Sequence, residues 1–315
     1  MDNHVPTVRQ AWRVRIIGWL KWIIGVGYLC IGAPGYKSKL VAVVFHEVND
    51  EPSAHARLTN TYSTKRNYLK QISLLQSIFN IIDVRNFSNA LETKKCLITF
   101  DDGYKGSLEA ARILDLLRIP SIHFLNLETI HGHSNSSALL HFKSINSDSP
   151  VDWSNSTPSN YKGTVEGFSG FETDKLARFA GPYLSTNELK ELKSFKTVTF
   201  GDHFLNHWYA NSLSNEEVIA NLARNAPQYS ESQWVENFFA APHGEISSEK
   251  IEIIANEGYK LAFSGRLWTS IGNIQVLPRI DMNNSINSKA TLFGSIAIMI
   301  LRNRLKTKDL ANSDA

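Results

Sequence analysis

The feature that most constrains the fold of this chain is an apolar run, Leu97 to Phe100, that stops at Asp101, Asp102 and Gly103. Consecutive apolar and β-branched residues are typical of a strand that is buried on both faces. Apolar residues then recur at helical spacing from Tyr104 to Leu117, so the segment predicts a strand, an acidic turn and a helix. The acidic pair would lie at the carboxyl end of the strand, where α/β folds place catalytic groups.

Two interpretations of the acidic pair are open from the residues alone. At a strand end, one carboxylate can bind a cation while its neighbour acts as a base. Alternatively, an aspartate before a helix caps the free backbone N–H groups of the first turn.

The remainder of the chain repeats the same strand and helix alternation. Apolar runs at 40–45, 81–82, 119–125 and 197–200 predict further strands, and His46 directly follows the first of them. Helical spacing over 69–79 and 185–193 separates these strands, which indicates parallel strands with helices outside. The apolar segment 291–301 predicts a last helix that packs on the domain and is too short to span a bilayer. Because basic residues follow it, contact with a membrane surface is the alternative.

Composition excludes some classes of function. With 315 residues, of which 43% are hydrophobic and 20% charged, the chain has an ordinary globular balance. The net charge of +3 is mild and the basic residues are scattered, so we expect no nucleic-acid binding. Cys30 and Cys96 give no disulfide framework and no cysteine metal site.

Residues 1–36 form a separate N-terminal segment. Arginines at positions 9, 13 and 15 precede an apolar stretch, Ile16 to Ala33, that contains one charged residue, Lys21. Its eighteen residues are nearly long enough for the roughly 30 Å hydrocarbon core of a bilayer. A membrane anchor, an interfacial helix and a helix packed on the domain are all compatible with this pattern.

The alternation breaks over residues 131–183, where polar residues, glycine and proline dominate. Such a stretch is either a functional insertion or poorly ordered. It contains His131, His133 and His141, which could bind a metal ion or lie solvated on the surface.

A second cluster of polar side chains follows the strand 197–200. His203 and His207 are four residues apart, which on a helical turn places two imidazoles on one face, as two ligands of one cation require. Together with an aspartate from another strand end, they would leave an open metal position, as in catalytic zinc sites. Alone, the pair is equally compatible with ordinary hydrogen-bonded histidines.

Several ordered motifs over about residues 40–282 resemble those of the polysaccharide deacetylases of the NodB-homology type. The T-F-D-D-G motif of that family is present as Thr99 to Gly103, and its H-x-x-x-H motif is similar to His203 to His207. The family's third motif resembles the segment Phe239 to Gly244, and the later G-Y-x-x-A-F motif resembles Gly258 to Phe263. The ending of the first strand, Phe45-His46, also looks like that of the family.

The resemblance implies a distorted (β/α)7 barrel over residues 37–310, interrupted by the polar insertion 131–183. It also implies a divalent ion, by default Zn²⁺, bound by Asp102, His203 and His207, with Asp101 as the general base. The oxyanion would be stabilised by the metal and by backbone near Pro242 and His243.

Two positions depart from the family pattern. His243 stands where the family usually has tyrosine, and Ala240 stands where it has arginine. The family's final histidine, the general acid, has no counterpart in the segment Val276 to Asp281, so His243 or His46 is left as the candidate acid. Arg279 either pairs with a site carboxylate or forms a structural ion pair.

The resulting expectation is a metal-dependent hydrolase that removes an N-acetyl or similar acyl group from a sugar of a cell-surface polysaccharide or lipid-linked glycan. A non-catalytic carbohydrate-binding relative and a hydrolase of another amide or ester are the alternatives. The N-terminal arginines favour association with a bacterial inner membrane and an exported barrel, with the cytoplasmic face as the other possibility. The oligomeric state cannot be read from the sequence.

Overall fold

Seven parallel strands close into a barrel in this computed structural model, which describes residues 8–34, 40–87, 94–130, 135–222, 235–265 and 269–313. Their order around the barrel is β1, β11, β9, β8, β7, β6 and β5, and β5 pairs with β1 to close the ring. The predicted (β/α)7 barrel is therefore confirmed. The barrel strands are β1 (Val41–Phe45), β5 (Lys95–Phe100), β6 (Ser121–Leu125), β7 (Val198–Asp202), β8 (Val235–Ala240), β9 (Leu261–Ser264) and β11 (Ile274–Asp281).

Four short strands complete the pairing. A two-residue strand, β4 (Asn80–Ile81), extends the sheet beyond β5, and β10 (Thr269–Ile271) runs antiparallel to β11. β2 (Glu47–Val48) and β3 (Tyr62–Ser63) form a small separate parallel pair just after β1.

Alternate residues of the barrel strands face two different cores. In β1, Val41, Val43 and Phe45 pack with apolar residues of the surrounding helices. Ala42 instead belongs to the cluster inside the barrel, with Leu97 of β5 and others. This alternation follows from the period of two in a strand, and it explains why both faces of β1 are apolar.

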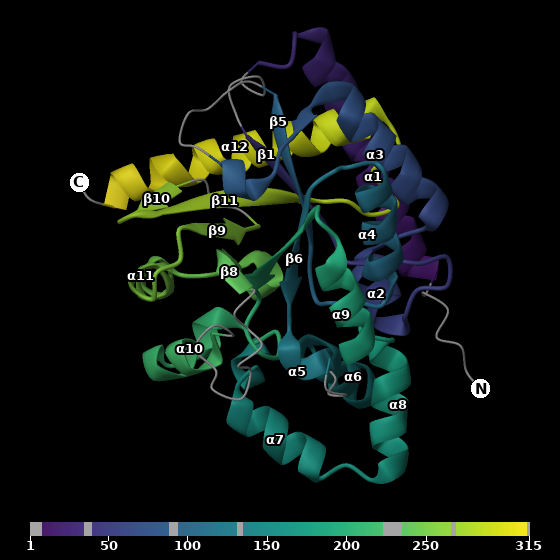
Figure 1. Ribbon diagram of the computed structural model, residues 1–315, viewed down its shortest axis with the longest axis vertical. Coiled ribbons are helices and arrows are strands. Elements are labelled where there is room, and N and C mark those ends of the chain that lie inside the picture. The colour runs from purple at the N-terminus through teal and green to yellow at the C-terminus, as the bar shows by residue number, and fades with distance from the viewer. Residues whose placement is uncertain are drawn as a thin grey trace.

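Helices surround the barrel (Figure 1). They are α1 (Val8–Cys30), α2 (Ala54–Thr59), α3 (Lys65–Ile78), α4 (Gly106–Leu116), α5 (Leu127–Ile130), α6 (Ser136–Ser147), α7 (Pro158–Glu166), α8 (Gly170–Ala180), α9 (Thr186–Ser194), α10 (Asn215–Asn221), α11 (Ser248–Asn256) and α12 (Lys289–Ser313). Short 3-10 helices lie at Val84–Asn86, Trp153–Asn155, Ala210–Ser212 and Pro242–Gly244.

The polar insertion is largely helical where the structure describes it. It contains α6, α7 and α8, which Figure 1 places below the barrel. These helices bury few side chains, and α7 buries none, so they leave no periodic apolar pattern in the sequence. A small cluster around Leu139, Leu176 and Phe179 holds α6 against α8.

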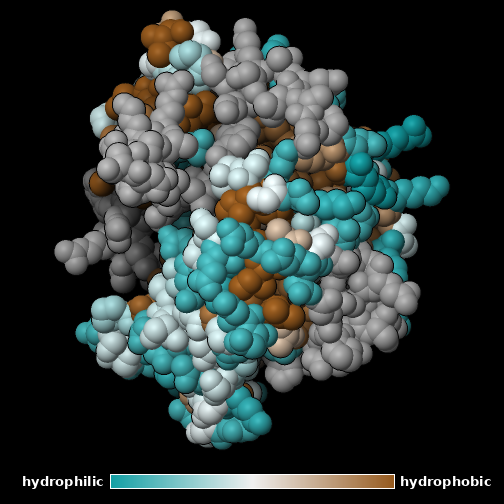
Figure 2. Space-filling model, turned by 90° about the vertical axis from the view of Figure 1, so that its left-hand side faces the viewer, coloured by the Kyte–Doolittle hydropathy of each residue, from teal (hydrophilic) through white to brown (hydrophobic). Residues whose placement is uncertain are grey.

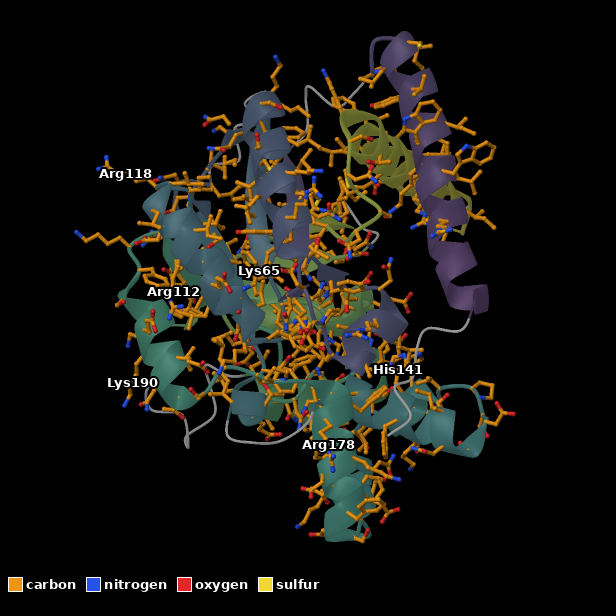
Figure 3. The ribbon with its side chains drawn as sticks, turned by 90° about the vertical axis from the view of Figure 1, so that its right-hand side faces the viewer. Lys65, Arg112, Arg118, His141, Arg178 and Lys190 are labelled. Atoms are coloured by element: carbon orange, nitrogen blue, oxygen red, sulfur yellow. The ribbon has the colours of Figure 1, made fainter. Side chains whose placement is uncertain are left out.

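The apolar N-terminal segment forms α1, which crosses α12 at the edge of the molecule (Figures 1 and 3). The two backbones touch: a Cβ on Gly25 would lie 1.8 Å from the carbonyl oxygen of Ala290, and one on Gly294 would lie 1.9 Å from that of Lys21. α12 begins near the predicted position but continues to Ser313. Among the described residues, no helix has both the length and the apolar character that crossing a membrane requires.

Because the seven barrel strands are parallel, their carboxyl ends meet at one end of the barrel. His46, Asp101, His203 and Gly265 directly follow β1, β5, β7 and β9 there, and Asp281 ends β11. Side chains from distant segments of the sequence therefore meet at one mouth of the barrel.

Candidate active site

The acidic pair leaves β5 in a tight reversal. Asp101 and Asp102 are 2% and 5% exposed, and the backbone N–H of Asp101 donates to the carbonyl oxygen of Phe45 at 2.9 Å. Asp102 and Gly103 both have positive φ, 70° and 71°, which turns the chain sharply and aims the two carboxylates into the barrel mouth. Helix α4 begins at Gly106 with Lys105 at its N-cap and no side-chain cap, so neither aspartate caps this helix.

The two histidines lie on a turn rather than on the helical turn that their spacing suggested. Phe204 and His207 adopt left-handed conformations, with φ of 56° and 54°. Asp202 fixes this turn because its Oδ1 accepts a hydrogen bond from the backbone N–H of Phe204 at 2.8 Å. Its Oδ2 accepts one from the hydroxyl of Tyr259 at 2.5 Å. Both imidazoles nevertheless face the same point.

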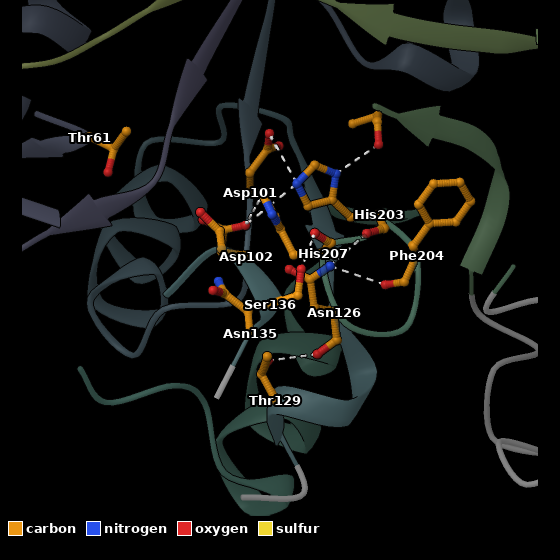
Figure 4. A network of polar contacts seen from close by, with 12 residues as sticks. Thr61, Asp101, Asp102, Asn126, Thr129, Asn135, Ser136, His203, Phe204 and His207 are labelled. Carbon is orange, nitrogen blue, oxygen red and sulfur yellow. Dashed lines mark hydrogen bonds and ion pairs between the residues drawn. The ribbon is translucent and has the colours of Figure 1, made fainter. Parts of the chain in front are cut away.

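Asp102, His203 and His207 converge at the mouth (Figure 4). The Oδ1 atom of Asp102 lies 3.5 Å from Nε2 of His203 and 3.2 Å from Nε2 of His207. All three ligand atoms lie within 4.8 Å of one another, and all three residues are buried. Two imidazole nitrogens and one carboxylate oxygen at this separation can share one divalent cation.

The hydrogen bonds around these groups fit a metal ion. Nδ1 of His203 donates to the carbonyl oxygen of Ala240 at 2.7 Å, which leaves the lone pair of Nε2 directed toward Asp102. Nε2 of His203 and Oδ1 of Asp102 are buried without a hydrogen-bond partner in the described part of the chain. Burial alone would raise the pKa of Asp102, but the neighbouring imidazoles of His207 and His203 outweigh it and lower the pKa. The carboxylate is thus ionised and available as a ligand.

Asp101 is held by Arg279 of β11. The two guanidinium nitrogens Nη1 and Nη2 donate to Oδ1 and Oδ2 of Asp101, each at 2.6 Å, and Nη1 also donates to Oγ1 of Thr99 at 3.1 Å. Burial acts to raise the pKa of Asp101, and the charges of Arg279 and His203 overcome it, so the pKa is lowered. Of the two interpretations left open for Arg279, pairing with a site carboxylate is the one observed.

These groups line a cavity of about 230 Å³ together with His46 and His243. His243 has a φ of 59°, and its ring centroid lies 4.1 Å from that of Trp153 and 4.5 Å from that of His207. Pro242 is buried beside His243 and does not line the cavity.

Two further histidines at the cavity were not selected from the sequence. Nε2 of His55 in α2 lies 3.3 Å from Nδ1 of His141 in α6, and Nδ1 of His55 lies 3.1 Å from the hydroxyl of Tyr104. His141 was considered only with His131 and His133, which lie outside the described residues. Nothing in the sequence brings α2 and α6 to the barrel mouth, because neither belongs to the strand and helix repeat.

Comparison with known proteins agrees with this arrangement. A family model described as "Polysaccharide deacetylase" matches residues 88–262, more than half of the chain. No sequence among the curated proteins matches.

Three solved structures illustrate the similarity of fold. The deacetylase PplD of Streptococcus pyogenes, solved with acetate, is 15% identical, with a TM-score of 0.53 over 82% of this chain and 98% of that one. IcaB of Ammonifex degensii is 15% identical, with a TM-score of 0.51 over 82% of this chain and 97% of that one. A polysaccharide deacetylase of Bacillus cereus is 13% identical, with a TM-score of 0.52 over 82% of this chain and 69% of that one.

The family match covers both the acidic turn after β5 and the two histidines after β7, the segments whose side chains converge at the barrel mouth. The chain belongs to the polysaccharide deacetylase family, a family of hydrolases that act on carbon–nitrogen bonds other than peptide bonds.

Proposed function

We propose that this protein removes an N-acetyl, or similar acyl, group from a sugar of a cell-surface polysaccharide or of a lipid-linked glycan. One observation carries the proposal: a carboxylate and two imidazoles, all buried, converge beside a second carboxylate, that of Asp101. Family membership supports a sugar deacetylase. The geometry of the four side chains supports a mechanism that uses a divalent ion and a general base.

Asp102, His203 and His207 would hold a divalent ion, by default Zn²⁺. When bound, such an ion supplies Lewis acidity, which polarises the amide carbonyl and acidifies water. The Asp202 turn positions the two histidines, and the hydrogen bond to the carbonyl oxygen of Ala240 orients the ring of His203.

Asp101 would act as the general base. Its carboxylate lies 3.7 Å from Nε2 of His203, at the edge of the donor set, and Arg279 fixes its orientation. It takes a proton from the attacking water as the new C–O bond forms at the amide carbon. The C–N bond then breaks, the acyl group leaves as a carboxylate, and the sugar amine takes up a proton.

The proton donor for the leaving amine is assigned to one of the two histidines on the cavity wall, His46 or His243. The backbone N–H of His243 is our candidate for stabilising the oxyanion. Replacing each histidine separately with glutamine distinguishes them, because loss of the acid lowers kcat and leaves binding of the substrate intact.

Replacement of Asp101 tests the proposal. Asp101→Asn keeps the size of the side chain and removes the base, so acetate release from N-acetylglucosamine oligomers should fall by about 10²–10⁴-fold. The metal content should stay that of the unaltered protein, which is the internal control. Turnover that survives the substitution would contradict the mechanism.

Saccharide binding without any acyl release would favour a non-catalytic relative, and release from a non-sugar amide or ester would favour the other hydrolase.

The protein's location is a further part of the proposal. We propose attachment to a membrane surface through α1, at a bacterial inner membrane with the barrel exported, or else on the cytoplasmic face. Large apolar side chains of α1 support it, including Trp19 and Trp22, which are 62% and 47% exposed. Co-sedimentation with anionic lipid vesicles tests it, and a protein that stays in the supernatant would refute it. The boundary between an N-terminal segment, residues 1–36, and the barrel, residues 37–310, stays a prediction.

A further inference from the structure

A second cavity, of about 430 Å³, lies between α1, α12 and the end of β11. Its walls are apolar where the two helices face each other. α1 contributes Ile17, Leu20 and Ile24, and α12 contributes Ile298 and Met299. The cavity is thus a groove with hydrocarbon walls, and we call it the helix groove.

The helix groove adjoins the catalytic cavity. Gly265, Arg279 and Asp281 line both. Arg279 is the residue that holds Asp101 at 2.6 Å, so the groove begins one side chain away from the proposed base. A molecule whose polar end occupies the catalytic cavity can therefore extend an apolar chain along the groove.

Charged groups lie where the two cavities meet. Lys21 of α1 and Arg302 of α12 line the groove beside Asp281, and Nζ of Lys21 lies 3.5 Å from Oγ of Ser285. Arg279 is paired with Asp101, so the remaining two cations and one carboxylate give this junction a net positive charge. An anionic linker between a sugar and a hydrocarbon chain would be stabilised there.

The helix groove depends on the packing of α1 against α12. The two helices are in backbone contact at Gly25 and Gly294. Outside the contact, apolar side chains of α1 point away from the molecule (Figure 3), and hydrophobic surface gathers at the top of the molecule, where α1 ends (Figure 2). Such a surface is suited to a lipid phase, from which a chain could enter the groove.

We propose that the substrate is a lipid-linked sugar, with its N-acylated sugar in the catalytic cavity and its alkyl or isoprenoid chain in the helix groove. The inference rests on the proposed deacetylase function and selects between the two substrate classes named there. The hydrocarbon walls hold the chain, and the junction accepts the linker. Burial of several methylene groups would then contribute directly to substrate affinity.

A pair of glycosides tests the inference. Methyl and dodecyl N-acetyl-β-glucosaminide carry the same sugar and differ only in the chain, and both are used below the concentration at which the dodecyl compound aggregates. We expect kcat/KM for acetate release to be at least tenfold higher for the dodecyl compound. Equal values for the two glycosides would overturn the inference.

Two neighbouring isoleucines of α1 provide a matched pair of variants. Ile24 lines the helix groove and is 41% exposed, whereas Ile23 is 42% exposed and is not part of the lining. Ile24→Glu places a charge in the path of the chain and should reduce the dodecyl preference to below threefold. Ile23→Glu adds the same charge outside the groove and should keep the preference. Equal loss in both variants would refute the groove as the binding site.

Binding provides a readout that does not depend on these variants. Calorimetric titration of the Asp101→Asn protein with the dodecyl glycoside should show binding at least tenfold tighter than titration with the methyl glycoside. If the protein releases acetate from N-acetylglucosamine oligomers but binds and cleaves the dodecyl and methyl glycosides equally well, the lipid inference is overturned and the deacetylase function stands. Absence of acetate release from every sugar tested, with metal bound, would overturn both.

Discussion

At the scale of single residues, the site could be predicted only where its side chains belong to a short sequence motif. Asp101, Asp102, His203 and His207 could be selected because two short motifs follow two strands, and parallel strands end at the same mouth. Arg279 could be named as a candidate partner of a site carboxylate, but the sequence did not indicate which carboxylate it would contact. Arg279 stands 178 residues away from Asp101 in the sequence, and its contact depends on the register in which β11 pairs with β1.

Replacement of Arg279 should move the pH dependence of catalysis. The guanidinium lowers the pKa of Asp101, so Arg279→Gln should raise that pKa and shift the acidic limb of kcat/KM toward higher pH. Arg279→Lys keeps the charge but loses the bidentate geometry, and a smaller shift is expected. A pH profile of acetate release measures both. An unchanged acidic limb in Arg279→Gln would mean that Asp101 is not the base whose ionisation limits the rate.

His123 should make stability depend on pH. Its ring is fully buried and stacks on Phe100 with the centroids 4.6 Å apart, and burial lowers its pKa from 6.5 to about 3. The unfolded chain therefore binds a proton that the folded chain does not bind, and stability falls as the pH drops from 6.5 toward 3. The loss is up to about 1.4 kcal/mol per pH unit.

His123→Asn cannot take up that proton, so its free energy of unfolding should depend less steeply on pH. Urea unfolding at pH 7.5 and pH 5.5 measures the two slopes. The variant is expected to be less stable at both values because it loses the stacking on Phe100, and only the difference in slope bears on the prediction. Identical slopes would show that His123 is not the group responsible.

At the scale of elements, strand and helix periodicity located most of the parallel strands and their helices but failed where elements are short or irregular. The spacing of His203 and His207 suggested a helical turn, yet left-handed residues and the Asp202 cap produce a tight turn instead. The helices of the insertion gave no signal because they bury little. The apolar pattern of α1 was clear, but its partner α12 could not be inferred, since close helix contacts require glycines at facing positions that only the fold brings together.

The contact between α1 and α12 should be sensitive to one methyl group. Gly294→Ala places a Cβ against the carbonyl of Lys21, and the two helices must separate, at a cost of about 1–3 kcal/mol in the free energy of unfolding. Gly27→Ala is the control: its Cβ meets nothing within 4 Å, and alanine favours the helix by up to about 1 kcal/mol. Thermal unfolding compares them. If Gly294→Ala were as stable as Gly27→Ala, the helices would not be in contact as described.

At the scale of the whole molecule, closure of the barrel is what turns separate motifs into a site. Apolar runs alternating with helical segments were enough to predict parallel strands with helices outside, and the resemblance to the deacetylase family implied that these strands close into a barrel. The walls of the mouth were not predictable, because α2 and α6 bring His55 and His141 there from outside the repeat. The helix groove likewise arises from the first and last helices, which meet only in the folded molecule.

The central claim is that Asp102, His203 and His207 share one divalent ion, and the metal content of the purified protein tests it most directly. The account predicts about one equivalent of a divalent metal per chain by mass spectrometry, with Zn²⁺ as the default, retained in Asp101→Asn and in His123→Asn. The same measurement should find it lost in His203→Ala and His207→Ala. Full metal content in either of these two variants, or no bound metal in the unaltered protein after incubation with Zn²⁺, would contradict the account.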